Sequence, residues 1–133
     1  ALCRVEHPNV VRFHAVHRDD ATGVLGLVME HVAGEGLDAR LRAKGTLDDA
    51  EVIDVGVALA WALAAVHDAG LVHRDVKPDN VIVEKKLGEE IHVTLLDLGC
   101  ASVPPERRLT GAPVPAREVY GTGGFIAPEL LGE

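Results

Sequence analysis

One uninterrupted apolar run lies at the centre of the sequence. Residues 55–66 carry no charged side chain, and this length falls short of the roughly 20 residues that cross a bilayer. Thr46, Asp48 and Asp49 precede the run as a helix N-cap does, and Gly70 follows as a stop signal. The pattern predicts a helix that is apolar on all sides and therefore buried, with no membrane-crossing segment.

Composition narrows the class of protein. At 133 residues and 47% hydrophobic content, the chain has enough apolar material for one folded domain. Its net charge of −8 argues against nucleic-acid binding. The two cysteines, Cys3 and Cys100, are too few for a disulfide scaffold and no signal peptide is visible. We therefore expect a cytoplasmic location.

Short aliphatic runs on either side of this helix predict strands. Residues 10–17 and 24–32 form one candidate antiparallel pair, and residues 81–83 and 91–96 form a second hairpin. Residues 101–124 carry several prolines and glycines and have no apolar period, which predicts a long irregular segment. Helices and hairpins together indicate an α+β fold.

The polar stretch at residues 73–80 reads His-Arg-Asp-Val-Lys-Pro-Asp-Asn. It contains a carboxylate (Asp75), a cation (Lys77) and an amide (Asn80), which are the group types that phosphoryl transfer requires. Seventeen residues after Asn80, Asp97 follows the second predicted strand. Magnesium prefers few protein ligands together with phosphate oxygens, so Asn80 and Asp97 are candidate ligands.

In these motifs the chain resembles the protein kinase family, whose catalytic loop H-R-D-x-x-x-x-N is followed by D-F-G and A-P-E. Residues 73–80 match the loop, and residues 97–99 read Asp-Leu-Gly, with Leu in place of Phe. Residues 127–129 read Ala-Pro-Glu. Because all three motifs are present in order, the resemblance covers nearly the whole chain.

The resemblance implies an α+β, protein-kinase-like fold that is truncated at both ends. Residues 1–32 would be a remnant of the N-terminal sheet lobe and the hinge. Residues 33–133 would be the first part of the helical C-terminal lobe, with the catalytic loop at 73–80 and an activation segment at 97–129. The glycine-rich loop and the strand lysine of the family would precede Ala1, so we expect the isolated chain to be nearly inactive.

The resemblance also implies roles for the catalytic residues. Asp75 would be the base, and Asn80 and Asp97 would hold Mg²⁺. Lys77 together with Gly121 and Thr122 is typical of serine/threonine kinases, in which Thr122 would hydrogen-bond toward Asp75 and Lys77. The expected reaction is transfer of the γ-phosphate of ATP to Ser or Thr hydroxyls of a protein substrate.

By the same resemblance, four consecutive residues and one strand residue would hold the adenine of ATP. Met29 would lie at the back of the pocket, Glu30, His31 and Val32 would form the hinge, and Ile82 would form the floor.

A regulatory set follows from the same family pattern. Arg74, beside the catalytic aspartate, is typical of kinases that are activated by phosphorylation, because an arginine there pairs with a phosphate. Thr110 is the first candidate acceptor and Ser102 the second; for both, an ordinary loop residue is an equally good interpretation.

Two alternatives remain open. A pseudokinase or kinase-derived interaction module would keep the fold without activity, although Asp75, Asn80 and Asp97 are all present. Residues 34–39 fit G-x-G-x-x-A, a pattern of dinucleotide-binding proteins, but a helix is predicted next where that fold needs a strand. The second alternative is remote.

Overall fold

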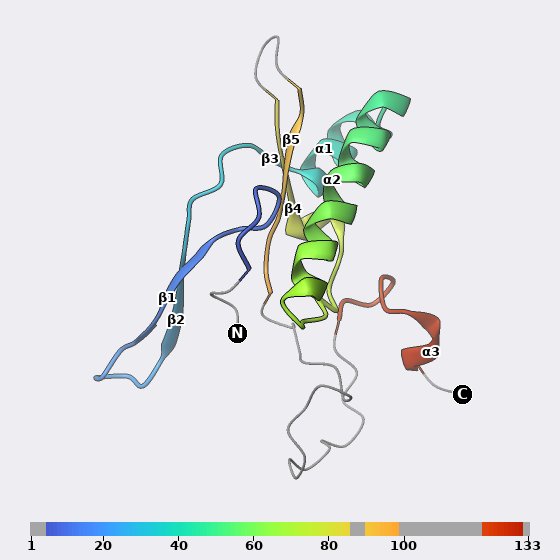
Figure 1. Ribbon diagram of the computed structural model, residues 1–133. Helices are drawn as coiled ribbons and strands as arrows, with labels where there is room; N and C mark the ends of the chain where they lie inside the picture. Colours follow the sequence, from blue (N-terminus) through green and yellow to red (C-terminus); the bar gives the residue numbers. More distant parts are fainter. Residues whose placement is uncertain (1–4, 86–89, 99–120, 132–133) are drawn as a thin grey trace.

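The computed structural model of the protein describes residues 5–85, 90–98 and 121–131. Figure 1 shows a long hairpin on one side, a small sheet in the centre and a long helix packed along that sheet. Strands and helices are both present, which confirms the predicted α+β class. The elements in chain order are β1 (Phe13–Arg18), β2 (Leu25–Met29), β3 (Glu35–Gly36), α1 (Leu37–Lys44), α2 (Asp49–Asp68), η2 (Pro78–Asn80), β4 (Val81–Glu84), β5 (His92–Leu95) and α3 (Pro128–Leu131).

The first predicted hairpin is confirmed, with shorter strands than expected. β1 and β2 pair antiparallel, from Phe13 opposite Met29 to Arg18 opposite Leu25. Asp19 closes the turn by accepting hydrogen bonds from the Ala21 backbone N–H at 2.8 Å and from the Thr22 hydroxyl at 2.9 Å. Aspartate is favoured at such positions because its short side chain bonds to the backbone two residues ahead.

The second sheet contains the predicted second hairpin. β4 and β5 pair antiparallel, and β3 adds to the outer side of β4 through Gly36 opposite Ile82. Two helices, α1 and α2, follow β3 before the next strand. Because β3 is antiparallel to β4, the glycine-rich residues 34–39 do not begin a parallel strand–helix–strand unit, and the dinucleotide-binding alternative is wrong.

Residues 9–11 connect the hairpin to the central sheet. The Leu95 N–H donates to Asn9 O at 2.8 Å, and the Val11 N–H donates to Leu95 O at 2.9 Å. The Asn9 side-chain amide donates to Val93 O at 2.7 Å. The chain that enters β1 is therefore fixed along β5, which is the strand that leads to Asp97.

Helix α2 begins where the sequence predicts. Asp48 is its N-cap and accepts from the Glu51 N–H at 2.9 Å, while the Glu51 carboxylate reaches back to the Asp48 N–H. This reciprocal pair satisfies two backbone donors that a helix start leaves open. Glu51 also forms ion pairs with Arg40 and Lys44 of α1, which links the two helices.

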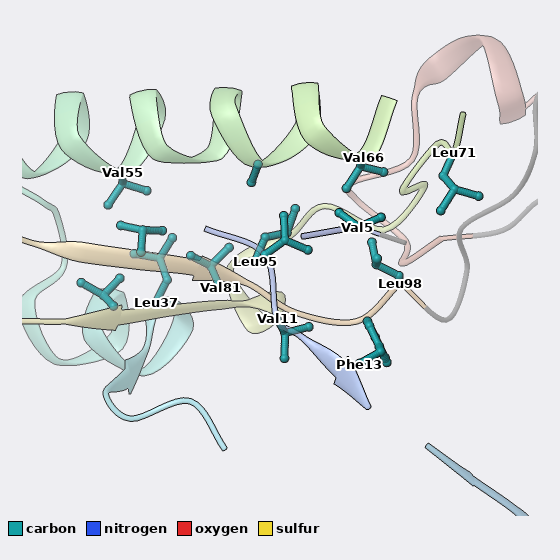
Figure 2. Packing of buried hydrophobic residues seen from close by; sticks show 14 residues of the cluster. Val5, Val11, Phe13, Leu37, Val55, Val66, Leu71, Val81, Leu95 and Leu98 are labelled. Carbon is teal, nitrogen blue, oxygen red and sulfur yellow. The ribbon is translucent and has the colours of Figure 1, made fainter. Parts of the chain in front are cut away.

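The core lies between α2 and the central sheet, as Figure 2 shows. Val55 and Val66 point from α2 toward Val81 of β4 and Leu95 of β5. Apolar burial of this kind is the dominant favourable term in folding. The complete set of buried apolar residues is Val5, Val10, Val11, Phe13, Leu37, Val55, Ala62, Val66, Leu71, Val81, Val83, Val93, Leu95 and Leu98.

The prediction that α2 is buried on all sides is wrong. Val52, Ile53, Val57 and Trp61 are all exposed. The reason is geometric, because within the described residues the elements that pack on α2 cover only one of its faces. Length and composition alone would let α2 cross a bilayer, with a mean hydropathy of 1.6 and 22% of that window buried. Core helices meet the same criteria, and one face of α2 packs on β5.

Candidate active site

His73 connects the polar loop after α2 to the end of β5. Its side chain is buried, and its Nε2 lies 3.0 Å from Leu96 O. The Asp75 N–H donates to His73 Nδ1 at 3.3 Å. If Nδ1 accepts, then Nε2 carries the proton and donates to Leu96. One imidazole thus holds the backbone on both sides of the site.

Asp75, Lys77 and Thr122 meet as the sequence predicts. Thr122 Oγ1 donates to Asp75 Oδ1 at 2.7 Å, and Lys77 Nζ lies 2.8 Å from Asp75 Oδ2. Lys77 also donates to the Thr122 hydroxyl. The aspartate is nearly inaccessible, with 7% of its surface exposed. Each of its two oxygens therefore has a separate partner.

This arrangement controls the charge of Asp75. Burial raises the pKa of its carboxyl, but the hydrogen bonds from Lys77 and Thr122 outweigh burial and hold the pKa below the ordinary value. The hydrogen bond to Asp75 raises the pKa of Lys77 against the opposite effect of burial, and Asp79 and Asp97 add smaller contributions. At neutral pH the pair is therefore a carboxylate and an ammonium.

Asn80, at the end of η2, joins two segments. Its side-chain amide donates to Asp75 O at 2.8 Å and to Asp75 Oδ2 at 3.2 Å. Its backbone oxygen accepts from the Leu96 N–H at 2.8 Å. Since the amide nitrogen is directed at Asp75, the amide oxygen is the atom that could bind a cation.

Asp97 follows Leu96 directly, so the bonds that fix Leu96 also place Asp97. Its side chain is exposed and its backbone is left-handed, with φ of 55°. The charge of Asp97 makes a small contribution to the raised pKa of Lys77. Such a backbone conformation in a residue other than glycine costs of order 1–3 kcal/mol and tends to occur at functional sites.

The donors present fit a magnesium ion. An amide oxygen of Asn80 and a carboxylate of Asp97 are hard oxygen ligands of the kind that Mg²⁺ prefers. The described residues contain no cluster of three or more His, Cys, Asp or Glu side chains suited to a metal. An ion held by Asn80 and Asp97 would therefore take its remaining ligands from water and phosphate oxygens.

Of the residues expected to hold adenine, Met29 lies on β2 and Ile82 on β4, and the other three lie in the connection between β2 and β3. Met29 ends β2, Glu30 and His31 follow it in exposed positions, and half-buried Val32 packs against the core. The Glu30 N–H donates to Arg12 O at 3.0 Å, and the Glu30 carboxylate accepts from the Arg12 N–H at 2.7 Å. This contact fixes the end of the hairpin where the hinge is predicted.

Ile82 lies on β4 beside the start of the next element. A Cβ atom added at Gly34 would lie 2.8 Å from Ile82 Cγ2 and 2.7 Å from Val83 O. Gly34 therefore lets the chain that leaves the predicted hinge pass directly over β4. The role of Ile82 as the floor of an adenine site stays a prediction.

The regulatory residues are only partly accounted for. Arg74 is half-buried and has a left-handed backbone with φ of 70°. Thr110 and Ser102 lie outside the described residues. The pairing of Arg74 with a phosphorylated side chain therefore stays a prediction.

His73 and Gly121 belong to the predicted motifs, but two of their contacts were not predicted from the sequence. The first is made by His73, whose two ring nitrogens hold Leu96 and Asp75. The second is made by the glycine at 121, with φ of 129°, where a Cβ atom would lie 3.0 Å from Arg74 O. The close approach at Gly121 lets Thr122 reach Asp75. The glycine-threonine pair was the available signal, because a glycine often marks close backbone approach.

Known proteins match this chain over nearly its whole length. The family profile described as Protein kinase domain matches residues 1–133. The chain is 38% identical over 96% of its length to the serine/threonine-protein kinase PkaA of Streptomyces coelicolor, covering 22% of that protein. It is 33% identical over 97% of its length to the serine/threonine-protein kinase pkn3 of Myxococcus xanthus, covering 23% of it.

A solved structure shows the same fold. The crystal structure titled Rad53 kinase domain and SCD2 superposes with a TM-score of 0.66 at 28% sequence identity. The match covers 77% of this chain and 37% of that chain. The chain thus spans about a fifth of the two bacterial relatives and under two fifths of the solved one.

Proposed function

Because this chain belongs to the protein kinase domain family, we propose that the protein containing it transfers the γ-phosphate of ATP to Ser or Thr hydroxyls of other proteins. One observation carries the proposal: the Asp75 carboxylate is nearly buried and held between Lys77 and the Thr122 hydroxyl. The names of the two bacterial relatives support the choice of Ser and Thr over Tyr.

Asp75 is the residue that orients the acceptor hydroxyl and takes its proton. Its Oδ1 accepts from the Thr122 hydroxyl in this structure, and a remaining lone pair of the carboxylate would accept from an incoming hydroxyl. Lys77 supplies a positive charge beside it, where negative charge develops on the transferred group. Together they provide a base and an electrostatic partner without any covalent intermediate.

Asn80 and Asp97 are the residues that would hold Mg²⁺. When bound, the ion neutralises charge on the phosphate oxygens of ATP. Asn80 has a second task, because its amide nitrogen fixes the Asp75 backbone and side chain. The proposed adenine contacts are Met29, Glu30, His31, Val32 and Ile82, with Arg74 as the proposed regulatory residue.

The test uses the longest stable form of the protein and radiolabelled ATP. Asp75→Asn and Asp97→Asn each remove a carboxylate, and loss of a positioned general base typically costs about 10² to 10⁴ in rate. Asp20→Asn, in the exposed turn after β1, is the matched control and should keep full activity. Phosphoamino-acid analysis should yield phosphoserine or phosphothreonine.

Undiminished transfer by both active-site variants would overturn the assignment. Wild-type protein that folds but transfers no phosphate under any condition would instead favour the pseudokinase or interaction-module alternative. The isolated chain is expected to be nearly inactive, and its cytoplasmic location stays a prediction.

A further inference from the structure

A hollow of about 250 Å³ lies between α2 and the chain that enters β5, away from the Asp75 loop. We call it the α2 groove and define it by Asn9, Asp54, Val57, Trp61, Glu90 and Ile91. In Figure 1, α2 runs beside β5 along this side of the sheet. None of these side chains takes part in the proposed phosphate transfer.

The groove has an apolar surface that solvent reaches. Val57 and Trp61 are four residues apart, so they lie on one side of α2, and they are 53% and 63% exposed. Ile91 forms the apolar part of the opposite wall and is half-buried. Tryptophan is among the residues that most often dominate binding energies at protein interfaces.

Two carboxylates accompany this apolar surface. Asp54 precedes Val57 by three residues and so lies on the same side of α2, and Glu90 lies on the opposite wall. Both side chains are exposed, and the groove's described lining includes no lysine or arginine. The groove therefore complements a ligand that is both apolar and positively charged.

Asn9, on the wall opposite α2, is fixed to β5 before any ligand arrives. The Asn9 side chain donates to Val93 O at 2.7 Å, and Asn9 O accepts from the Leu95 N–H at 2.8 Å. A surface that is already ordered loses less conformational entropy on binding. The volume suits one or two side chains, since pockets for drug-sized molecules span about 300–1,000 Å³.

We propose that the α2 groove docks an extended segment of a partner protein in which arginine stands beside a large aliphatic residue. The aliphatic side chain packs between Val57 and Ile91. The guanidinium lies over the exposed Trp61 ring, as cations do on aromatic faces. It pairs there with the carboxylate of Asp54 or Glu90.

The test measures binding of a fluorescein-labelled peptide of alternating arginine and leucine, without Ser, Thr or Tyr, to the longest stable form of the protein. Trp61→Ala should weaken binding about tenfold or more, because hot-spot truncation typically has effects of this size. The double variant Asp54→Asn with Glu90→Gln should weaken binding about fivefold and reduce its salt dependence.

Matched controls distinguish binding at the α2 groove from nonspecific binding of the peptide. Leu25→Ala and Asp20→Asn change an exposed apolar and an exposed acidic residue of the β1–β2 hairpin, and both should leave affinity unchanged. A peptide with glutamate in place of arginine should not bind. All groove variants should keep wild-type phosphate transfer, so failure here is distinguishable from failure of the proposed function.

Three results would overturn the proposal. The first is a Trp61→Ala variant that binds the peptide as tightly as wild type. The second is Trp61 emission that caesium ions do not quench, because another part of the protein then covers the groove. Trp61 is the only tryptophan of the chain, so the difference between wild type and Trp61→Phe isolates its signal. The third is self-association abolished by Trp61→Ala, which would assign the groove to a second copy.

Discussion

The Thr122 hydroxyl donates a hydrogen bond to Asp75 Oδ1 at 2.7 Å, although 47 positions separate the two residues in the chain. This contact joins the segment at 121–131 to the buried loop that follows α2. It also gives Thr122 two simultaneous roles, because the same hydroxyl accepts from Lys77. The loop geometry of Asp75 and Lys77 therefore depends on a residue far along the sequence.

We predict that Thr122→Val lowers the rate of phosphate transfer by about 10- to 100-fold, the size expected when one hydrogen bond to a charged group is lost. The variant removes a bond that depresses the pKa of Asp75, so that pKa should rise toward 3.8. The acidic limb of the rate profile should therefore move to higher pH. Steady-state kinetics at several pH values measure both effects.

Thr122→Ser is the matched control, since it keeps the hydroxyl and should retain most of the activity. A Ser variant that loses as much activity as the Val variant would contradict the prediction, because the serine hydroxyl keeps the hydrogen bond to Asp75.

We predict that the ion pairs of Glu51 make the free energy of unfolding depend on pH in the acidic range. The hydrogen bond from Arg40, followed by that from Lys44, lowers the pKa of Glu51 from 4.5 to about 2. A depressed folded-state pKa gives stability that is present above the unfolded value and is lost as the pH falls through the folded value. The contribution should therefore decline from about pH 4.5 to about pH 2.

Denaturant unfolding of wild type and Glu51→Gln at several pH values measures this effect. The difference in unfolding free energy should be largest near neutral pH and should shrink across that acidic window. A difference that stays constant down to pH 2 would contradict the assigned ion pairs.

We predict opposite effects of alanine at two glycines. Gly34 has φ of 129°, and a Cβ there would lie 2.7 Å from Val83 O, so Gly34→Ala should destabilise the fold by about 1–3 kcal/mol. Gly56 lies inside α2, where a Cβ meets nothing within 4 Å. Gly56→Ala should stabilise the fold by about 1 kcal/mol through helix propensity. Thermal and denaturant unfolding test both, and two changes of the same sign would refute this reading of Gly34.

We predict that His73→Phe leaves the Asp75 N–H and Leu96 O without their partner. Each unsatisfied buried backbone group costs about 1–3 kcal/mol. Asp75 and Leu96 would then be held less firmly, so transfer should fall together with the unfolding free energy. His73→Asn, which keeps a donor and an acceptor, should recover part of both. A Phe variant with wild-type stability would show that His73 does not join the two segments.

Much of the active loop could be predicted because its signals are local in sequence. The order of Asp75, Lys77 and Asn80 is contained in eight residues, and Thr122 was assigned its partners from the motif that it belongs to. The structure brings Asp75, Lys77 and Thr122 into hydrogen-bonding contact as expected. The capped start of α2 was also predicted, because its N-cap signal involves neighbouring residues.

Features that depend on contacts between elements distant in the sequence were not predicted. The prediction that α2 is buried on all sides was wrong. Periodicity shows that a helix face is apolar, but it cannot show what packs against that face. The ion pairs of Glu51 with Arg40 and Lys44 were missed because nothing in sequence indicates that α1 folds back beside the start of α2. The hydrogen bonds of His73 depend on how closely the end of β5 passes the loop.

The dual contacts of Asn80 explain why an amide, rather than an acid, occupies that position. A group there donates a hydrogen bond to the Asp75 carboxylate and, in the proposed site, would present an oxygen to a metal; among side chains of this length only asparagine does both. An aspartate of the same shape would set two negative charges about 3.2 Å apart, in the place of the Asn80–Asp75 contact. One of the two acids would then tend to hold a proton. The neutral amide avoids this repulsion beside Asp75, and Asp97 stays the proposed acidic ligand of the ion.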